Sequence, residues 1–76
     1  MNVVIYSKNN CVYCDMAIKL TQDNKFNLVI KKLDVDFNRE ELLELFPEAK
    51  SFPQIIINDV HLGGYTEFKK FLQHSW

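Results

Sequence analysis

The chain is poor in cysteine: it has only two, Cys11 and Cys14, among 76 residues. Once these two are paired with each other, no cysteine remains for a structural disulfide. Secreted domains of this size usually carry several disulfides, so we expect a reducing compartment and a cytoplasmic location. The sequence also has no basic N-terminal start followed by a long apolar run, and we therefore expect no signal peptide.

Long apolar runs and a large net charge are absent as well. Runs such as Ile55-Ile56-Ile57 are far too short to cross a bilayer, so we expect no membrane association. The formal net charge of −1 gives no support to nucleic-acid binding. No internal repeat, low-complexity tract or linker interrupts the sequence, which predicts one domain over residues 1–76. The apolar fraction of 47%, with six Phe, three Tyr and one Trp, is enough for a core.

The first half of the sequence predicts a parallel β-α-β unit. Residues 2–6 are rich in β-branched side chains, which suits a strand covered on both faces. Residues 12–24 predict a helix because apolar side chains recur at helical spacing. The side chains of this stripe are Met16, Ala17 and Leu20. Residues 28–35 predict a second strand, and the helix between the two strands implies a right-handed parallel connection.

A second helix is predicted between Asn38 and Pro47. Asn38 can cap it, with Glu41 three residues later in a capping-box arrangement. The predicted buried stripe consists of Leu42, Leu43, Leu45 and Phe46. Pro47 marks the end of the helix, because the residue before a proline disfavours helical backbone.

The last third of the sequence predicts a hairpin and a helix. Asn58-Asp59 tolerates the left-handed backbone of a two-residue turn between strands 54–57 and 60–62. Gly63-Gly64 ends the second strand, and Thr66-Glu67 opens a helix. Its sheet-facing side chains are Phe68, Phe71 and Leu72. The order β-α-β-α-β-β-α predicts an α/β fold with a four-stranded mixed sheet and helices on both faces.

The two cysteines lie where the first strand gives way to the first helix. There the Cys11 sulfur meets the positive end of the helix, which favours thiolate over thiol. Cys14 follows on the same helical face, close enough to form a disulfide. The alternative is half of a zinc site, but its other ligands would have to be His61 and His74, which have no familiar finger spacing. Chemistry at sulfur is therefore the leading hypothesis.

This element order, with the cysteine pair after the first strand, resembles the thioredoxin fold and, within it, the glutathione-using glutaredoxins of bacteria and phages. Cys11-Val12-Tyr13-Cys14 is similar to the family's Cys-Pro-Tyr-Cys. Ser51-Phe52-Pro53-Gln54 is similar to its Thr-Val-Pro-Gln, whose proline is cis. Gly63-Gly64-Tyr65-Thr66-Glu67 is similar to its Gly-Gly-Tyr-Thr-Asp. Val12, Ser51 and Glu67 depart from the pattern, although Ser51 keeps the hydroxyl and Glu67 keeps the carboxylate.

The resemblance implies a role for each motif. Cys11 would be the nucleophile and Cys14 the resolving thiol, with Lys8 adding positive charge near the sulfur. A cis Pro53 would expose the backbone of Phe52 to a peptide-like substrate. The sequence alone leaves open an ordinary proline at the start of an edge strand.

The remaining residues would bind glutathione. Its γ-glutamyl end would meet the glycine pair and the helix that starts near Thr66. Its glycyl carboxylate would lie towards Lys8 and Tyr13. Thr66 and Glu67 would also act as ordinary helix-capping residues. The expected glutathione-binding set is Lys8, Tyr13, Ser51, Phe52, Pro53, Gly64, Tyr65, Thr66 and Glu67.

We therefore expect a monomeric, glutathione-dependent thiol–disulfide oxidoreductase without a tightly bound cofactor or metal. Its partners would be glutathione and disulfide-containing or glutathionylated proteins, ribonucleotide reductase being one that the resemblance allows. One alternative is a thioredoxin-like reductant served by a flavoprotein reductase. Another is a dimer that holds a [2Fe–2S] cluster through Cys11 of each chain, since Val12 replaces the usual proline.

Overall fold

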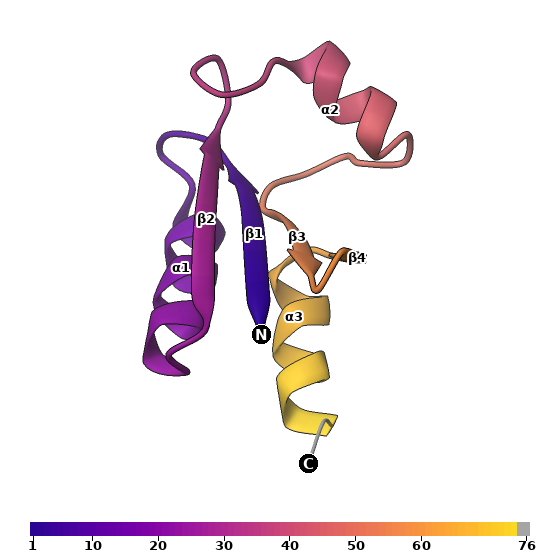
Figure 1. The fold of residues 1–76 in the computed structure, drawn as a ribbon. Helices are drawn as coiled ribbons and strands as arrows, with labels where there is room; N and C mark the ends of the chain where they lie inside the picture. Colours follow the sequence, from indigo (N-terminus) through magenta and orange to yellow (C-terminus); the bar gives the residue numbers. More distant parts are fainter. Residues whose placement is uncertain (75–76) are drawn as a thin grey trace.

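A four-stranded sheet in the order β2-β1-β3-β4 organises the chain. The computed structural model describes residues 1–74 (Figure 1). Its elements are β1 (Asn2–Ser7), α1 (Val12–Asp23), β2 (Asn27–Lys32), α2 (Arg39–Leu45), β3 (Gln54–Ile57), β4 (Val60–Gly63) and α3 (Tyr65–His74). This is the predicted order, and the sheet is mixed as predicted: β1 pairs in parallel with β2 and antiparallel with β3.

The β3–β4 hairpin turns at the two residues that the sequence indicates. Asn58 and Asp59 have φ values of +48° and +68°, the left-handed backbone that a tight hairpin turn requires. β4 then carries Gly63 back beside Ile55 of β3. The hairpin thus delivers the start of α3 to the same end of the sheet as the start of β3.

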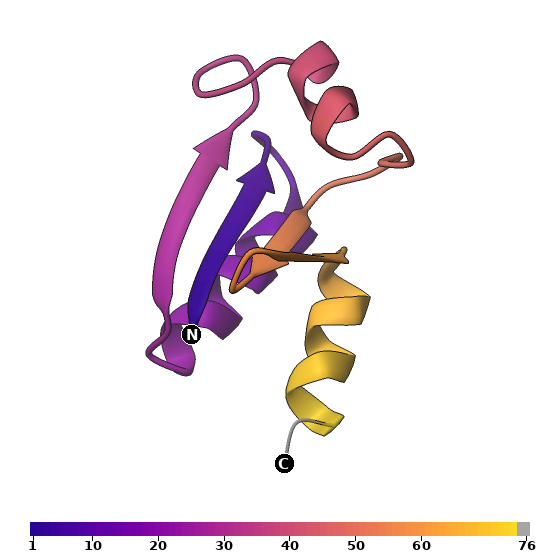
Figure 2. The ribbon, with the colours of Figure 1, turned by 45° about the vertical axis from the view of Figure 1, so that its right-hand side comes forward.

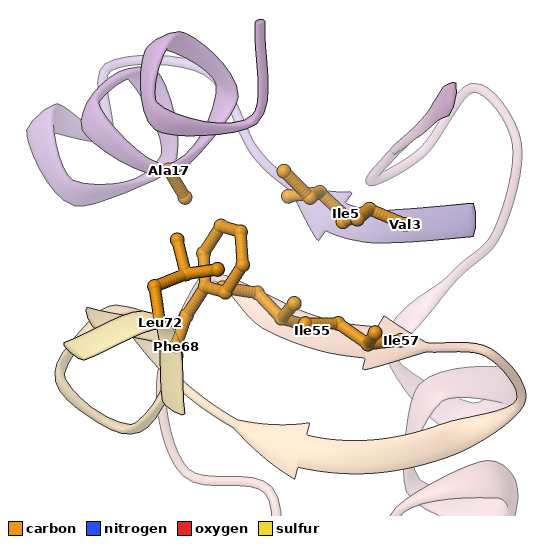
Figure 3. Close-up of a cluster of buried hydrophobic side chains, with 7 residues drawn as sticks. All are labelled: Val3, Ile5, Ala17, Ile55, Ile57, Phe68 and Leu72. Carbon is orange, nitrogen blue, oxygen red and sulfur yellow. The ribbon is translucent and has the colours of Figure 1, made fainter. Parts of the chain in front are cut away.

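One face of the sheet is buried under α1 and α3. Val3 and Ile5 project from β1 to this face, because residues two apart in a strand share a side. Phe68 of α3 is fully buried among them (Figure 3). The described members of this cluster, the aliphatic face, are Val3, Ile5, Ala17, Ile55, Ile57, Phe68 and Leu72. α1 and α3 also contact each other, and Figure 2 shows both helices beside the sheet.

The opposite face is covered only at one end. There Phe37, Leu42 and Phe46 are buried against the alternate side chains of the strands, Tyr6 and Ile56, and against Phe52. We call this cluster the aromatic face. α2 lies beyond the ends of β1 and β2 rather than along their length (Figure 1). Its capping box is present as predicted: Asn38 Oδ1 accepts the Glu41 N–H, and Glu41 Oε1 accepts the Asn38 N–H.

Because this face of the sheet is covered only in part, several residues predicted to be buried are exposed or half-buried. Leu43 and Leu45 are 48% and 57% exposed, because α2 is a short helix that buries only one side. β1 is fully buried on one face only, whereas Val4 and Tyr6 on the other face are half-buried. The prediction that β1 is covered on both faces is therefore only partly correct.

Three further predictions need correction. β2 ends at Lys32, and Val35 lies in the following turn with 77% of its surface exposed. Met16 is 40% exposed because α1 buries Cys14, Ala17 and Thr21 instead. α3 begins at Tyr65, one residue before the predicted start. No helix among residues 1–74 is long and apolar enough to span a membrane.

Candidate active site

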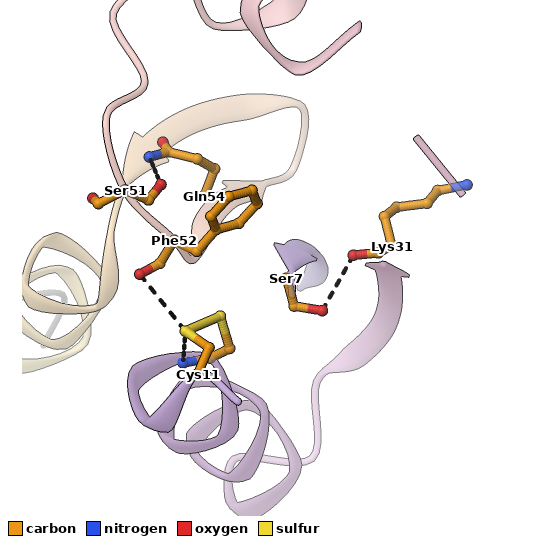
Figure 4. Close-up of a disulfide and its surroundings, with 7 residues drawn as sticks. Ser7, Cys11, Lys31, Ser51, Phe52 and Gln54 are labelled. Atoms are coloured by element: carbon orange, nitrogen blue, oxygen red, sulfur yellow. Dashed lines mark hydrogen bonds between the residues drawn. A yellow bond between two sulfur atoms is a disulfide. The ribbon is translucent and has the colours of Figure 1, made fainter. Parts of the chain in front are cut away.

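Cys11 is the N-cap residue of α1. Its backbone is extended, with φ −121° and ψ 103°, and its Sγ accepts the N–H of Cys14 at 3.3 Å. Asn10 makes the tight entry to the helix with φ +55°, a conformation that Asn tolerates better than most residues. The two cysteines form a disulfide with a Cα–Cα distance of 5.2 Å (Figure 4). The predicted position of the first sulfur at a helix N-terminus is thus confirmed.

The two cysteine residues differ in burial. Cys14 lies in the first turn of α1 and is 1% exposed, whereas Cys11 is 8% exposed. A nucleophile from outside therefore reaches Cys11 more readily than Cys14. The unpaired N–H groups at the start of α1 also favour a negative charge on the Cys11 sulfur.

The segment before β3 faces the cysteines. The Phe52–Pro53 peptide bond is cis, as the resemblance implies. The carbonyl oxygen of Phe52 lies 3.9 Å from Cys11 Sγ (Figure 4). β3 lies between β1 and β4, so the alternative of a proline at the start of an edge strand is wrong. The backbone of Phe52 is therefore next to the reactive position.

The glycine pair brings α3 to the same place. Gly63 has φ +122°, which strains any other residue. A Cβ on Gly63 would stand 3.3 Å from Glu67 Cγ, so the glycine also leaves room for that side chain to fold back. At Gly64 a Cβ would stand 3.6 Å from the carbonyl oxygen of Pro53. The three sequence motifs thus meet, and the first N–H groups of α3 point out of the helix start.

Two ring contacts place the remaining predicted residues. The rings of Tyr13 in α1 and Tyr65 in α3 lie 5.9 Å apart between centroids. Lys8 Nζ lies 5.6 Å from the centroid of the Phe52 ring, a favourable cation–π position. Lys8 therefore reaches the proline segment, and its charge stands at the rim of the site.

A groove of about 850 Å³ runs along these motifs. This is within the size range of small-molecule sites. Eight predicted residues line it: Tyr13, Ser51, Phe52, Pro53, Gly64, Tyr65, Thr66 and Glu67. Lys8, Cys11 and Cys14 are not part of its lining. Cys11 and Lys8 adjoin the groove through their contacts with Phe52, and Cys14 is joined to Cys11 by the disulfide.

The groove has lining residues that sequence reasoning missed. They are Glu48, Ala49, Lys50, Gln54, His61 and Lys70, whereas Gly63, also in the lining, belongs to the glycine pair expected to meet glutathione. Gln54 stands inside a recognised motif, and Lys70 follows Thr66 at helical spacing, so a signal existed for these two. His61 gave none, because only the fold brings β4 beside Gln54. Among residues 1–74, no group of three or more His, Cys, Asp and Glu side chains could hold a metal ion.

Known proteins match both the sequence and the fold. The family model of glutaredoxins matches residues 3–62. The mitochondrial glutaredoxin-2 of Rattus norvegicus is 35% identical over 68 residues, which cover 86% of this chain and 43% of that relative. This chain therefore spans less than half of that relative's length. Glutaredoxin 1 of Escherichia coli (strain K12) is 26% identical over 83 residues, covering 99% of this chain and 96% of the relative.

A solved structure agrees with these sequence matches. Glutaredoxin 1 from Francisella tularensis, solved in complex with cacodylate, superposes with a TM-score of 0.81 at 28% identity. The match covers 95% of this chain and 92% of that one. The family model, the bacterial relative and the solved structure all point to glutaredoxins. The Cys11–Cys14 disulfide at the start of α1 is consistent with these matches. The chain belongs to the glutaredoxin family.

Proposed function

We propose that this chain is a glutathione-dependent thiol–disulfide oxidoreductase. The observation that carries the proposal is the position of Cys11 Sγ, which is at the N-terminus of α1 and beside the Phe52 carbonyl. The adjoining groove supports glutathione as the co-substrate, because it offers peptide backbone at Phe52 and helix N–H groups near Thr66. These contacts give no support to the thioredoxin-like or cluster-binding alternatives.

The reaction with a protein–glutathione mixed disulfide takes two exchanges. The Cys11 thiolate attacks the glutathione sulfur, a Cys11–glutathione disulfide forms, and the protein sulfur leaves as a thiolate. A second glutathione thiolate then attacks the bound glutathione sulfur, which releases oxidised glutathione and restores the Cys11 thiolate. A stabilised thiolate is the better leaving group, so the helix start helps this second step most.

Protein disulfides require both cysteines. Cys11 attacks one sulfur of the disulfide, and Cys14 then attacks Cys11 in the resulting mixed disulfide. The protein leaves as a dithiol, and the Cys11–Cys14 disulfide remains, the state that the structure holds. Two glutathione molecules return it to the dithiol and leave as oxidised glutathione. The partner proteins, ribonucleotide reductase among them, and the cytoplasmic location stay predictions.

The first experiment separates the two sulfurs. C11S should abolish turnover of a glutathionylated peptide, because the attacking thiolate is lost. C14S should keep most of it, because the exchange with glutathione needs only Cys11. Both variants should unfold at similar urea concentrations when compared with the reduced wild-type protein. An equal loss in the two variants would contradict the proposed route.

The second experiment measures ionisation of Cys11. The rate of alkylation by iodoacetamide in C14S should rise with pH to a midpoint below the ~8.5 of a free thiol. The expected cause is the N-terminus of α1, where the helix dipole and the first N–H groups favour a thiolate over a thiol. A midpoint at the free-thiol value would show that the helix start leaves the sulfur unactivated.

A further inference from the structure

The side chain of Gln54 holds the backbone next to the reactive sulfur. It is 5% exposed, and its Nε2 donates a hydrogen bond to the Ser51 carbonyl oxygen at 2.8 Å (Figure 4). Its Oε1 lies 2.8 Å from Nε2 of His61. A backbone carbonyl only accepts hydrogen bonds, so the amide nitrogen of Gln54 must face Ser51 and its oxygen must face His61. It follows that His61 Nε2 carries a hydrogen and donates it.

His61 is itself fixed from a second side. Its ring stacks on Phe46, with centroids 4.1 Å apart and planes at 26°. Phe46 is 7% exposed and is the C-cap residue of α2, and β4 pairs His61 with Ile56 of β3. The imidazole thus connects α2 and β4 to the segment that precedes β3. His61 is an exposed residue of β4, so these two contacts are what place its ring beside Gln54.

We propose that His61 is a positioning residue that acts through Gln54 on the backbone of Ser51 and Phe52. The Phe52 side chain has contacts of its own: its ring lies 6.2 Å from the Phe37 ring between centroids, and Lys8 Nζ lies over it. With both the ring and the preceding carbonyl fixed, the Phe52 backbone keeps one orientation towards Cys11. The substrate affected is the peptide portion of a glutathione mixed disulfide, and in this the inference rests on the proposed function.

The expected effect is on binding more than on bond exchange. The hydrogen bonds of Gln54 join Ser51 and His61 and involve neither cysteine, so we expect a loosened Phe52 backbone to weaken the ground state and the transition state alike. Such a change raises KM and leaves kcat nearly unchanged. The rise should be about two- to tenfold, the range that the loss of one neutral hydrogen bond allows.

Three variants separate the hydrogen bond from the packing. H61F keeps a ring on Phe46 but removes the donor, so KM for a glutathionylated peptide should rise two- to tenfold. H61Q keeps an N–H donor and should recover most of the wild-type KM. Q54M replaces the amide that links His61 to Ser51 with an apolar side chain of similar volume. If His61 acts through this amide, adding H61F to Q54M should raise KM no further. The urea midpoint of each variant checks that it is folded.

Two kinetic outcomes would overturn the proposal. One is a wild-type KM in H61F. The other is an equal rise in H61F and H61Q that follows their loss of stability, because this would reduce His61 to a packing residue. Additive effects of H61F and Q54M would likewise show that the two residues do not act as a unit.

A readout without glutathione keeps this proposal separate from the proposed function. In ¹⁵N NMR spectra of the oxidised protein, the imidazole of neutral His61 should be the Nε2–H tautomer. H61F should shift the amide resonances of Ser51 and Phe52, and H61Q should shift them less. A protein that shows these shifts but has no glutathione activity would disprove the function and leave the positioning intact. If H61F is active and the amide resonances of Ser51 and Phe52 are unchanged, the positioning role of His61 is wrong and the proposed function still stands.

Discussion

The two faces of the sheet are closed by different chemistry. The buried members of the aliphatic face, under α1 and α3, are aliphatic side chains around the phenyl ring of Phe68, and Ile5, Ile55 and Phe68 are fully buried there. Other aromatic side chains, such as Phe26, pack partly buried against this cluster. The aromatic face is a chain of ring contacts: Tyr6 meets Phe37 edge-on at 5.0 Å and Phe46 at 5.3 Å. Polar side chains stand at the rim of the aromatic face, where His61 stacks on Phe46 and Lys8 lies over the Phe52 ring, whereas the described members of the other cluster all have apolar side chains.

The difference separates stability from positioning. Aliphatic packing is non-directional, and it contributes free energy in proportion to the area that it buries. Ring contacts and hydrogen bonds are directional, so they fix orientation as well as burial. The aromatic face includes Phe52, whose backbone faces Cys11. We infer that the aliphatic face mainly holds the fold together, while the aromatic face mainly shapes the groove.

The largest effect should come from the aliphatic face. F68A removes a fully buried ring and should lower the free energy of unfolding by about 3–5 kcal/mol. For a small domain this is a large part of the total stability, so much of the protein should be unfolded without denaturant. Urea unfolding followed by circular dichroism measures the change. A loss below 1 kcal/mol would show that α3 is not anchored by this side chain.

A smaller loss is expected on the aromatic face. L42A should lower the free energy of unfolding by about 2 kcal/mol, the low end for such a change, because the cluster is small and close to solvent. L42A should also shift the amide resonance of Phe52 in the folded protein, because both residues belong to the aromatic face. F68A lies at the other face and should affect Phe52 only by unfolding the whole protein. If L42A costs as much stability as F68A, the proposed division between the faces fails.

The capping box of α2 offers a test that leaves both clusters intact. N38A removes the side-chain acceptor for the Glu41 N–H and should cost about 1 kcal/mol of unfolding free energy. N38S should retain most of the stability, because its hydroxyl can accept the same hydrogen bond. Urea midpoints of the two variants give the comparison. Equal loss in N38A and N38S would mean that the cap does not hold α2.

The smallest effect should come from the outer side of α2. L43S and L45S replace side chains that are 48% and 57% exposed, so each should change the unfolding free energy by no more than about 0.5 kcal/mol. Urea unfolding checks this directly. A large destabilisation in either variant would show that the aromatic face extends across the helix.

Local signals in the sequence predicted local structure well. Asn58-Asp59 indicated the hairpin turn, and Asn38 with Glu41 indicated the start of α2, because both depend on residues a few positions apart. Cys11 at the strand-to-helix turn was predicted for the same reason. The roles assigned to the glutathione-binding residues remain predictions, although most of those residues line one groove.

Burial was predicted less well. Met16, Leu43 and Leu45 are apolar and stand at helical spacing, yet they face solvent. Helical spacing indicates which residues share a side, but not how wide a stripe the neighbouring elements cover. α2 ends after seven residues and lies past the strand ends, so only Leu42 and Phe46 find partners.

The sequence by itself determined the order of elements, the turn that places Cys11 at a helix start, and the glycine pair before α3. These follow from backbone preferences that act over a few residues. Only the tertiary structure decided that Gln54 would join His61 to Ser51, and that the groove would extend past the recognised motifs. The Gln54–Ser51 hydrogen bond is local, but the contact between Gln54 and His61 joins two strands, and its geometry exists only after the sheet has brought β3 and β4 together.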